Sequence, residues 1–309
     1  MNAANLRHLL REMKANWLSY VFVAPFTIVF LLFIFVPTVA AIVLSFTSFN
    51  AIEPPKFVGL RNYINLLTQD TTFWMHAIPN TFKFAIIVGP IGYLCSFALA
   101  WLITQLPSKS RVWYTLAMYT PSLTAGVAMA VVWIVIFSGD RLGYMNSILL
   151  ELGIIQQPQL WVQDPKYLMN IMIIVSLWAS MGVGFLAMLA GIQSVDKTLY
   201  EAGKIDGIKS RFQEIWYITI PSMRPQMLFG AVMAIVGTLR AGSISVELTG
   251  SNPTPQYAGH LLINHVDDYG FIRYEMGYAS SISVVLLIII YATSRLCWRL
   301  FGTEGETKS

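Results

Sequence analysis

Residues that could carry out bond-making chemistry are few in this chain of 309 residues. The segment 203–210 partly matches a phosphate-binding loop, but Ile208 stands where that motif requires a glycine before the lysine. His265 shows no metal-ligand spacing and lies beside Asp267 and Asp268, which predicts a solvated external loop. The other histidines are equally isolated along the sequence: His8, His76 and His260. We therefore expect no catalytic residue, no metal and no cofactor on this chain, and we expect that it is not an enzyme.

A second group of polar residues could line a path for a ligand. Arg240, Ser243 and Glu247 follow one face of a predicted membrane helix over 226–246 and just beyond it. Arg240 lies about 21 Å along that helix, roughly 9 Å inside the outer edge of a hydrocarbon core of about 30 Å. A charge at this depth is costly and usually faces a water-filled cavity. We therefore predict polar contacts to a ligand, with two alternatives: Arg240 pairs with Glu247, or its side chain extends to the headgroups.

Trp178 and Trp133 are weaker candidates for the same path, because indole rings can stack on the rings of a ligand. Aromatic residues make up 13% of the chain, however, and most such rings serve in packing or as interface anchors. Both interpretations of these two tryptophans stay open from the sequence.

The composition of the chain indicates that lipid is its main surroundings. Hydrophobic residues make up 56% and charged residues only 12%, with a mean hydropathy of +0.60, whereas a soluble domain is about 25% charged. The net charge of +4 is small and scattered, so we expect no nucleic-acid partner. The two cysteines, Cys95 and Cys297, do not indicate a disulfide framework.

Six apolar segments are long enough to cross a bilayer as helices, which requires about 20 residues each. We predict spans over 20–46, 84–103, 114–137, 169–192, 226–246 and 278–298. Their apolar residues run continuously and do not alternate, which excludes a membrane barrel and predicts an all-α membrane protein. The apolar run after Lys14 is longer than the core of a signal peptide, so we expect it to stay in the membrane.

The distribution of basic residues predicts the orientation, because cytoplasmic connections carry an excess of Lys and Arg. With both termini in the cytoplasm, 13 of the 20 basic residues lie on that side. They are Arg7, Arg11, Lys14, Lys109, Arg111, Lys197, Lys204, Lys209, Arg211, Arg224, Arg295, Arg299 and Lys308. The remaining seven are Lys56, Arg61, Lys83, Arg141, Lys166, Arg240 and Arg273. We therefore predict a cytoplasmic segment over 1–19, a transmembrane domain over 20–300 and a cytoplasmic tail over 301–309.

The longest predicted cytoplasmic connection, 194–225, has the capping signals of two short helices. Asp196 can cap the first helix, and Gly207 supplies the left-handed residue that ends it. Ser210 and Gln213 form the pattern of a capping box at the start of the second helix. The connection is therefore predicted to be folded and stiff.

The same connection presents an apolar edge. Its second helix is predicted to stop before Pro221. The small residues Ala202 and Gly203 would let another backbone approach closely, as in a helix that lies in the groove of a partner. The alternative is an ordinary amphipathic loop that lies on the lipid headgroups.

The connection resembles the signature loop of the inner-membrane permeases of ABC importers, particularly the sugar-type permeases related to those for maltose and glycerol phosphate. That signature reads Glu-Ala-Ala-x-x-x-Gly, followed further along by Ile-x-Leu-Pro. The chain matches it, or has the family's usual residue nearby, at Glu201, Ala202, Asp206, Gly207, Phe212, Ile218, Pro221 and Pro225. It departs from the pattern mildly at Gly203, Ile208 and Ile220. Further similarity covers most of the chain: Phe57 to Leu60, Asn62, Tyr63, Gly143, Asn146, Leu248 to Gly250, Pro253 and Gly277 to Ala279.

The resemblance implies the architecture of a type I ABC importer permease in a bacterial cytoplasmic (inner) membrane. It implies a second permease, two ATPase subunits that bind ATP and magnesium, and an external solute-binding protein as partners. The loop would couple to the ATPase subunits through Glu201, Ala202, Gly203, Asp206, Gly207, Phe212, Ile215 and Pro221. The solute would be a sugar or oligosaccharide, and Arg240 points weakly to an anionic one.

Other functions were weighed against this one. The same type of permease could carry a solute that is not a sugar. An ion-coupled secondary transporter would need spans interrupted by Gly or Pro at corresponding places in the two halves, and we predict none. A membrane enzyme would need clustered His, Asp or Glu at the end of a span, and the sequence has no such cluster.

Overall fold

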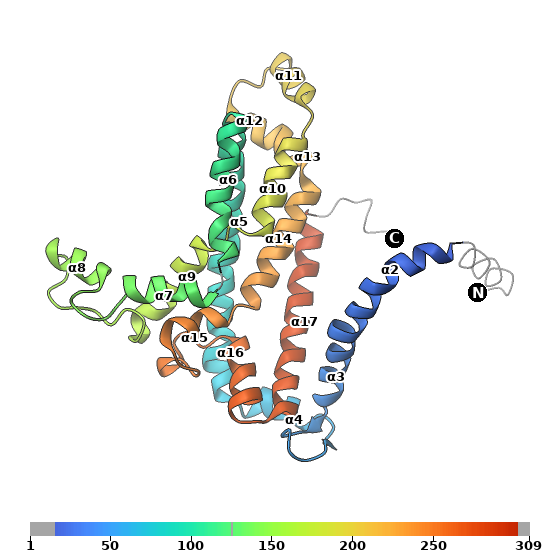
Figure 1. The fold of residues 1–309 in the computed structure, drawn as a ribbon, viewed down its shortest axis with the longest axis vertical. Helices are drawn as coiled ribbons and strands as arrows, with labels where there is room; N and C mark the ends of the chain where they lie inside the picture. The colour runs from blue at the N-terminus through green and yellow to red at the C-terminus, as the bar shows by residue number, and fades with distance from the viewer. Residues whose placement is uncertain (1–15, 125, 302–309) are drawn as a thin grey trace.

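The computed structural model describes residues 16–124 and 126–301, and most of these residues are helical (Figure 1). Residues 1–15 of the predicted cytoplasmic segment 1–19 lie outside the described residues. Residues 302–309 of the predicted tail 301–309 lie outside them as well. Several long helices run side by side along the long axis of the molecule (Figure 1). The connection that contains α11 (Lys197–Ile205) and α12 (Arg211–Glu214) lies at one end, and α4 (Arg61–Thr68) lies at the other (Figure 1).

Described helices long and apolar enough to cross a membrane number four, or five when one bent pair counts as a single span. They are Trp17–Leu44, Phe73–Thr104, Pro165–Ser194, the pair Arg224–Leu239 and Ser243–Thr249, and Met276–Arg299. These helices correspond to the first, second, fourth, fifth and sixth of the predicted spans. Their length and composition make the chain a multi-pass helical protein.

The predicted third span, 114–137, corresponds to two separate helices. α6 (Ser108–Leu123) and α7 (Gly126–Ile136) run in different directions (Figure 1). Pro121 lies in the last turn of α6, where its ring removes an N–H donor and crowds the carbonyl one turn earlier. The helix ends two residues later, and Thr124 is extended, with φ −74° and ψ 132°.

Beyond α7 the chain forms an arm that projects from the side of the bundle and includes α8 (Tyr144–Glu151) (Figure 1). A single buried side chain, Asn146, holds the arm together. Its Nδ2 donates to the carbonyl oxygens of Ser138 and Gln159 at 3.0 and 3.1 Å. Its Oδ1 accepts from Nε1 of Trp161 at 2.9 Å. Because all these partners are in the arm, this side chain cross-links segments of the arm that are distant in the sequence.

The centre of the bundle contains four helices. The π-helical turn η2 (Phe73–Ala77) leads directly into α5 (Ile78–Thr104). α5 packs against α10 (Val183–Ser194) and α14 (Arg224–Leu239). α10 and α14 also pack against each other, and α14 packs on its other side against α17 (Met276–Phe301). The buried apolar side chains between these helices form the core that positions the site described below.

The first span leans away from the rest of the bundle (Figure 1). It is continuous through α2 (Trp17–Phe30), η1 (Leu31–Phe35) and α3 (Val36–Leu44), and only its second half packs against α17. None of the side chains in these three elements is buried. The rest of the described chain therefore leaves a long apolar surface here that suits lipid or another membrane helix.

Short elements join the helices at the end opposite α11. β1 (Thr47–Ser48) and β2 (Lys56–Phe57) pair as antiparallel strands directly after the first span. The helix α4 follows these strands in the same segment of the sequence, between the first two long helices. Asn62, at the start of α4, is buried. Its Nδ2 donates to the carbonyl oxygens of Ser45 and Thr47, and these bonds fix α4 against the end of the first span.

The prediction that His265 lies in a solvated loop is wrong, because the side chain is fully buried. It belongs to α16 (Leu262–Asp267), which packs against α17 and η2 and so turns His265 into the core. Its Nε2 lies 2.8 Å from Oδ2 of Asp70, and Tyr278 donates to the same oxygen at 2.8 Å. Its Nδ1 lies 3.1 Å from Nε2 of His260, which is also fully buried.

Candidate functional site

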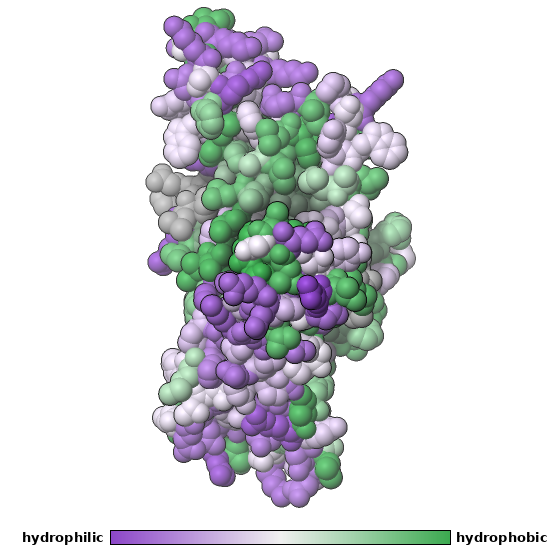
Figure 2. All heavy atoms as spheres, turned by 90° about the vertical axis from the view of Figure 1, so that its left-hand side faces the viewer, coloured by the Kyte–Doolittle hydropathy of each residue, from purple (hydrophilic) through white to green (hydrophobic). Residues whose placement is uncertain are grey.

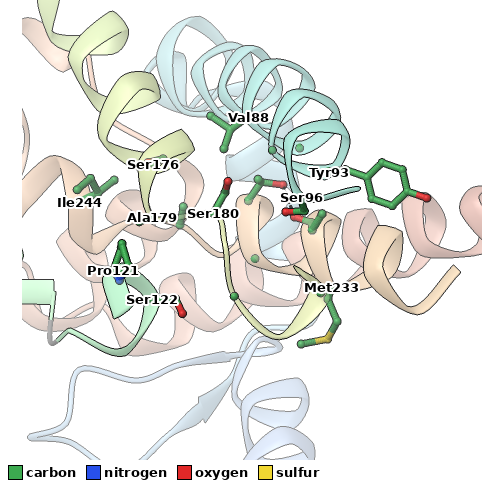
Figure 3. A pocket seen from close by; sticks show the side chains of 18 of the residues that line it. Val88, Tyr93, Ser96, Pro121, Ser122, Ser176, Ala179, Ser180, Met233 and Ile244 are labelled. Atoms are coloured by element: carbon green, nitrogen blue, oxygen red, sulfur yellow. Dashed lines mark hydrogen bonds between the residues drawn. The ribbon is translucent and has the colours of Figure 1, made fainter. Parts of the chain in front are cut away.

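Three interrupted helices surround the main cavity of the bundle. α6 ends where the chain turns toward α7, α9 (Pro165–Trp178) is separated from α10, and α14 is bent by 46° against α15 (Ser243–Thr249). Residues at all three interruptions, together with one side of α5, line the same cavity of about 440 Å³ (Figure 3). Interrupted helices free backbone groups that hydrocarbon cannot satisfy, so they occur where protein or water surrounds them and often at ligand sites.

The walls of this cavity consist mainly of small and hydroxyl-bearing residues. The hydroxyls belong to Ser96, Ser122, Thr124, Ser176, Ser180, Thr238 and Ser243 (Figure 3). Ser122 and Ser180 each donate to the carbonyl oxygen three residues earlier, at 2.8 and 2.7 Å. Their oxygens therefore face the cavity as acceptors for the hydroxyl groups of a ligand.

Glu247 is the only charged side chain among the described residues that line the cavity. Its carboxylate lies against the start of α7, where a Cβ on Gly126 would be 2.8 Å from Oε1. A similar close contact occurs between α10 and α14, where a Cβ on Gly184 would be 3.5 Å from the Cα of Gly230. Glycines at these positions allow the carboxylate and the two helices to approach closely.

The residues predicted for a ligand path are only partly brought together. Ser243 and Glu247 line the cavity, whereas Arg240 is not among its lining residues. Arg240 caps the end of α14, its side chain is exposed, and the bend that follows separates it from Ser243 and Glu247. Among the described residues it forms no ion pair, so the alternative pairing with Glu247 is absent from this structure.

The two predicted tryptophans lie beside each other, away from the cavity lining. Trp133 on α7 and Trp178 at the end of α9 meet edge to face, with ring centroids 5.5 Å apart. Trp133 also stacks on Phe137 at 5.8 Å and packs against the buried core. Trp178 is 44% exposed, and the buried Nε1 of Trp133 has no hydrogen-bond partner among the described residues. A contact of either ring with a ligand stays a prediction.

The sequence analysis missed most of the cavity. It found no spans interrupted by Gly or Pro at corresponding places in the two halves, and it gave no sign of the two interruptions that the structure shows, between α9 and α10 next to Gly182 and between α14 and α15 next to Gly242. The available signal was the grouping of Ser, Gly and Ala within apolar runs, as in Ala179-Ser180 with Gly182 and in Ala241-Gly242. Interrupted spans alone therefore do not distinguish this chain from a secondary transporter.

The predicted caps of the connection 194–225 are confirmed. Oδ1 of Asp196 accepts from the backbone N–H of Thr198 at 2.9 Å, and this bond lowers the pKa of the carboxyl group. Gly207 follows α11 with φ +94°, a conformation that favours glycine. Ser210 and Gln213 form the capping box, with bonds of 3.2 and 3.1 Å.

We predicted that the second helix of the connection stops before Pro221, and this prediction was wrong. The helix continues through a π-helical turn, η3 (Ile215–Thr219), into α13 (Ile220–Ser222). Pro221 therefore lies within the last turn of the helix. In a π-helical turn each backbone N–H donates to the carbonyl oxygen five residues earlier, one residue further than in an α-helix. This wider spacing leaves room for a proline ring shortly afterwards.

Gly203 has a role inside the chain that the sequence did not indicate. It is buried, and a Cβ at this position would lie 2.7 Å from Cδ1 of Ile218 and 3.1 Å from Cδ1 of Ile208. Next to it, the hydroxyl groups of Tyr200 and Thr219 lie 3.0 Å apart. Gly203 thus lets α11 pack directly on η3, and the whole connection forms one stiff unit.

The outer surface of this unit is partly apolar. Ile205, Phe212 and Trp216 are 86%, 83% and 69% exposed. Glu201, Ala202 and Asp206 are exposed beside them, whereas Ile215 is half-buried. Figure 2 shows the polar side chains that gather at this end of the molecule above a band of apolar ones. Large apolar side chains at a polar end mark a surface for a protein partner.

A known family of transport proteins matches the greater part of the chain. Residues 92–297 match the family described as the binding-protein-dependent transport system inner membrane component, and the chain belongs to this family. It is therefore a helical membrane permease of the ABC importer class, and this family is one of transporters, not of enzymes.

Known relatives narrow this class to the sugar-type permeases. The arabinooligosaccharides transport system permease protein AraP of Bacillus subtilis (strain 168) is 33% identical, over 93% of this chain and 90% of its own. The crystal structure of a bacterial ABC transporter involved in the import of the acidic polysaccharide alginate matches with 26% identity and a TM-score of 0.76, over 94% and 99% of the two chains. A bacterial alginate ABC transporter in complex with an alginate pentasaccharide-bound periplasmic protein has the same fold, with 23% identity and a TM-score of 0.78 over 96% and 99%.

Proposed function

We propose that this chain forms half of the translocation path for a sugar or oligosaccharide in a binding-protein-dependent ABC importer. The cavity between the three interrupted helices carries this proposal (Figure 3). A sugar presents several hydroxyl groups at short spacing. Each can donate a hydrogen bond to a serine oxygen whose own O–H donates to a carbonyl oxygen of its helix. Ser122 and Ser180 supply such acceptors, and the carboxylate of Glu247 supplies a stronger one.

A path for a transported solute must bind it weakly enough to release it. The cavity offers mostly neutral acceptors on small residues and lacks large aromatic platforms among its described lining residues, apart from Tyr93 and Phe84 at its edge. Contacts of this kind orient a sugar without holding it tightly. Arg240 directly precedes lining residues of the bend, and there it could approach the carboxylate of an acidic sugar. A solute other than a sugar is the alternative for the same cavity.

In this proposal the connection 194–225 docks into an ATPase subunit that binds ATP and magnesium. The stiffness of the unit supports a mechanical role, because capped helices that pack on each other transmit a rigid-body movement that a flexible loop would absorb. The exposed side chains of Ile205, Phe212 and Trp216 supply an apolar docking surface. The exposed Glu201 and the left-handed Gly207 belong to the same connection, and the family signature implies that both take part in this docking.

The remaining partners and the topology also belong to the proposal. A similar second permease would complete the path and cover the apolar surface of α2 and α3. A solute-binding protein would deliver the sugar to the end that contains α4 and α16. The chain would cross a bacterial inner membrane six times, with α6 and α7 as an interrupted third span and both termini in the cytoplasm.

The coupling role can be tested on the assembled transporter in proteoliposomes, with measurements of sugar uptake and ATP hydrolysis. Replacing Gly207 by Val strains the left-handed position, and Glu201→Lys reverses the exposed charge. We expect both variants to assemble and hydrolyse ATP but to lose most uptake. Lys209→Gln removes an exposed charge from the same loop and serves as the control. Full uptake by both coupling variants would rule out this role for the loop.

The role of the cavity needs a separate test. Ser180→Val removes an acceptor from the wall and fills part of the space, and should raise the KM for uptake several-fold while ATP hydrolysis stays coupled. Ser283→Val on α17 is a matched control, because Ser283 also donates to its own helix but does not line the cavity. Uptake driven by an ion gradient without ATP would instead support a secondary transporter.

A further inference from the structure

A second hollow lies at the end of the bundle that contains α11 and α12. It has a volume of about 420 Å³ and is bounded by the ends of α5, α6 and α10 together with α11 and α12. Its basic residues are Arg111, Lys197, Lys204 and Arg211. The one carboxylate among its described lining residues, that of Glu214, is paired with Arg211 at 2.9 Å. Three cations therefore face this hollow without a carboxylate partner among the described residues.

Arg111 is fixed in the wall of the hollow by hydrogen bonds from its guanidinium group to backbone carbonyl groups. Its Nη2 donates to the carbonyl oxygens of Thr104 at 2.9 Å and Leu106 at 3.2 Å, which hold the guanidinium group at the junction of α5 and α6. Its Nε is buried and has no hydrogen-bond partner among the described residues. A buried N–H without an acceptor is costly, and an anionic oxygen in the hollow would satisfy it.

A second, less polar groove continues from the same point. Its volume is about 380 Å³, and it shares Arg111 and Gln193 with the basic hollow. The other lining residues follow one face of α6: Ser108, Val112, Thr115, Leu116 and Tyr119. The side chains of Val112 and Leu116 are 65% and 51% exposed, so apolar surface is open here. The two hollows together suit a molecule with a charged head and an apolar tail.

Exposed aromatic side chains place this region at the surface of the membrane. Trp113 and Tyr114 on α6 are 72% and 53% exposed, and they directly follow the residues of the hollow. Tyr217 on η3 is 67% exposed. Tryptophan and tyrosine gather at the level of the lipid headgroups. Basic pockets between membrane helices at this level bind the headgroups of anionic lipids.

We propose that the basic hollow binds the phosphate of an anionic phospholipid, with an acyl chain in the adjoining groove along α6. The phosphate oxygens would accept from Nε of Arg111 and from the ammonium groups of Lys197 and Lys204. Because Lys197 and Lys204 belong to α11 and Arg111 to α6, the bound lipid would tie the coupling segment to the bundle. Anionic lipid would therefore stiffen the element through which the chain contacts its partners.

The test uses the full chain in nanodiscs of phosphatidylcholine with added phosphatidylglycerol, and measures retained lipid by native mass spectrometry. We expect the double variant K197Q/K204Q to lower the affinity for phosphatidylglycerol roughly 30-fold, given the typical contribution of one basic residue at a membrane surface. K209Q/R224Q removes two charges near the same end, but neither residue lines the hollow, so this control should retain the lipid. Equal loss of lipid in the two double variants would overturn the proposal.

Two further arms separate the lipid from other ligands. V112Q/L116Q should weaken the binding of phosphatidylglycerol, because the acyl chain would lie against polar groups. Glycerol 3-phosphate, added to discs of pure phosphatidylcholine, should bind weakly. Tight binding of this soluble compound would identify a free phosphate ester as the ligand and overturn the assignment to lipid. Unchanged lipid retention in K197Q/K204Q would also overturn the proposal. A raised KM for sugar uptake by the same variant, in the assembled transporter in proteoliposomes, would then make the hollow part of the release path.

Discussion

The buried pair His260 and His265, at the end of the bundle that contains α4 and α16, predicts a measurable dependence of stability on pH. His260 is fully buried, and its imidazole ring has one hydrogen bond, between its Nε2 and Nδ1 of His265, which leaves its Nδ1 without a partner among the described residues. Burial, reinforced by the nearby charges of His265, His76 and Arg273, lowers the pKa of His260 to about 3 from 6.5. The folded protein therefore keeps His260 neutral at a pH where an unfolded chain would protonate it.

The size of the effect follows from this difference in pKa. Between pH 6.5 and pH 3 the unfolded state binds one more proton than the folded state, so the free energy of unfolding falls as the pH falls, by about 1.4 kcal/mol per pH unit. From pH 7.5 to pH 5.5 the loss is about 1.4 kcal/mol, or roughly 3 °C in Tm. Asp70 adds nothing in this window, because hydrogen bonds hold its pKa at about 2 against burial, and its contribution is lost only below about pH 3.8.

The assay is thermal unfolding of the purified full chain, followed by tryptophan fluorescence at pH 7.5, 6.5 and 5.5. The comparison is with His260→Gln, whose amide N–H can replace Nε2 as a donor to His265 but does not titrate. The free energy of unfolding of the wild type should fall by about 1.4 kcal/mol more than that of the variant over this range. All other titrating groups are common to both proteins and cancel in the difference. Equal pH slopes would refute this assignment of the neutral, buried state of His260.

Three further substitutions test the packing described above. Gly203→Leu drives a side chain into Ile218 and should cost about 1–3 kcal/mol, seen as faster proteolysis of the loop between α11 and α12. Gly126→Ala puts a methyl group against the carboxylate of Glu247, and we expect a several-fold rise in the KM for uptake without a change in expression. Asn146→Ala leaves several buried groups of the arm without partners and should cost about 3 kcal/mol, measured as protease sensitivity confined to 137–164. Unchanged protease sensitivity or KM in any of these variants would contradict the corresponding contact.

Features that depend on nearby residues could be predicted from the sequence alone. The apolar runs predicted most of the long helices, because the bilayer demands a continuous stretch of fixed length. The caps at Asp196 and Ser210 and the left-handed Gly207 were also predicted correctly. Each of these involves a hydrogen bond or a backbone conformation within a few residues, so the local pattern contains all the required information.

The cavity and the buried polar groups depended on contacts between distant parts of the chain. His265 meets Asp70 across 195 positions, and its charged neighbours in the sequence wrongly suggested solvent. Gly203 matters through Ile218, and the interruptions of three separate helices form a cavity only because the helices pack with those interruptions at the same place. The sequence thus determined most of the membrane helices, the family and the capped helices of the connection 194–225, since these follow from composition and local spacing. Ser243 and Glu247 were predicted for the ligand path from their spacing, but tertiary packing alone decided that Ser96, Ser122, Ser176 and Ser180 line the same cavity, because no local pattern encodes which helix faces will meet.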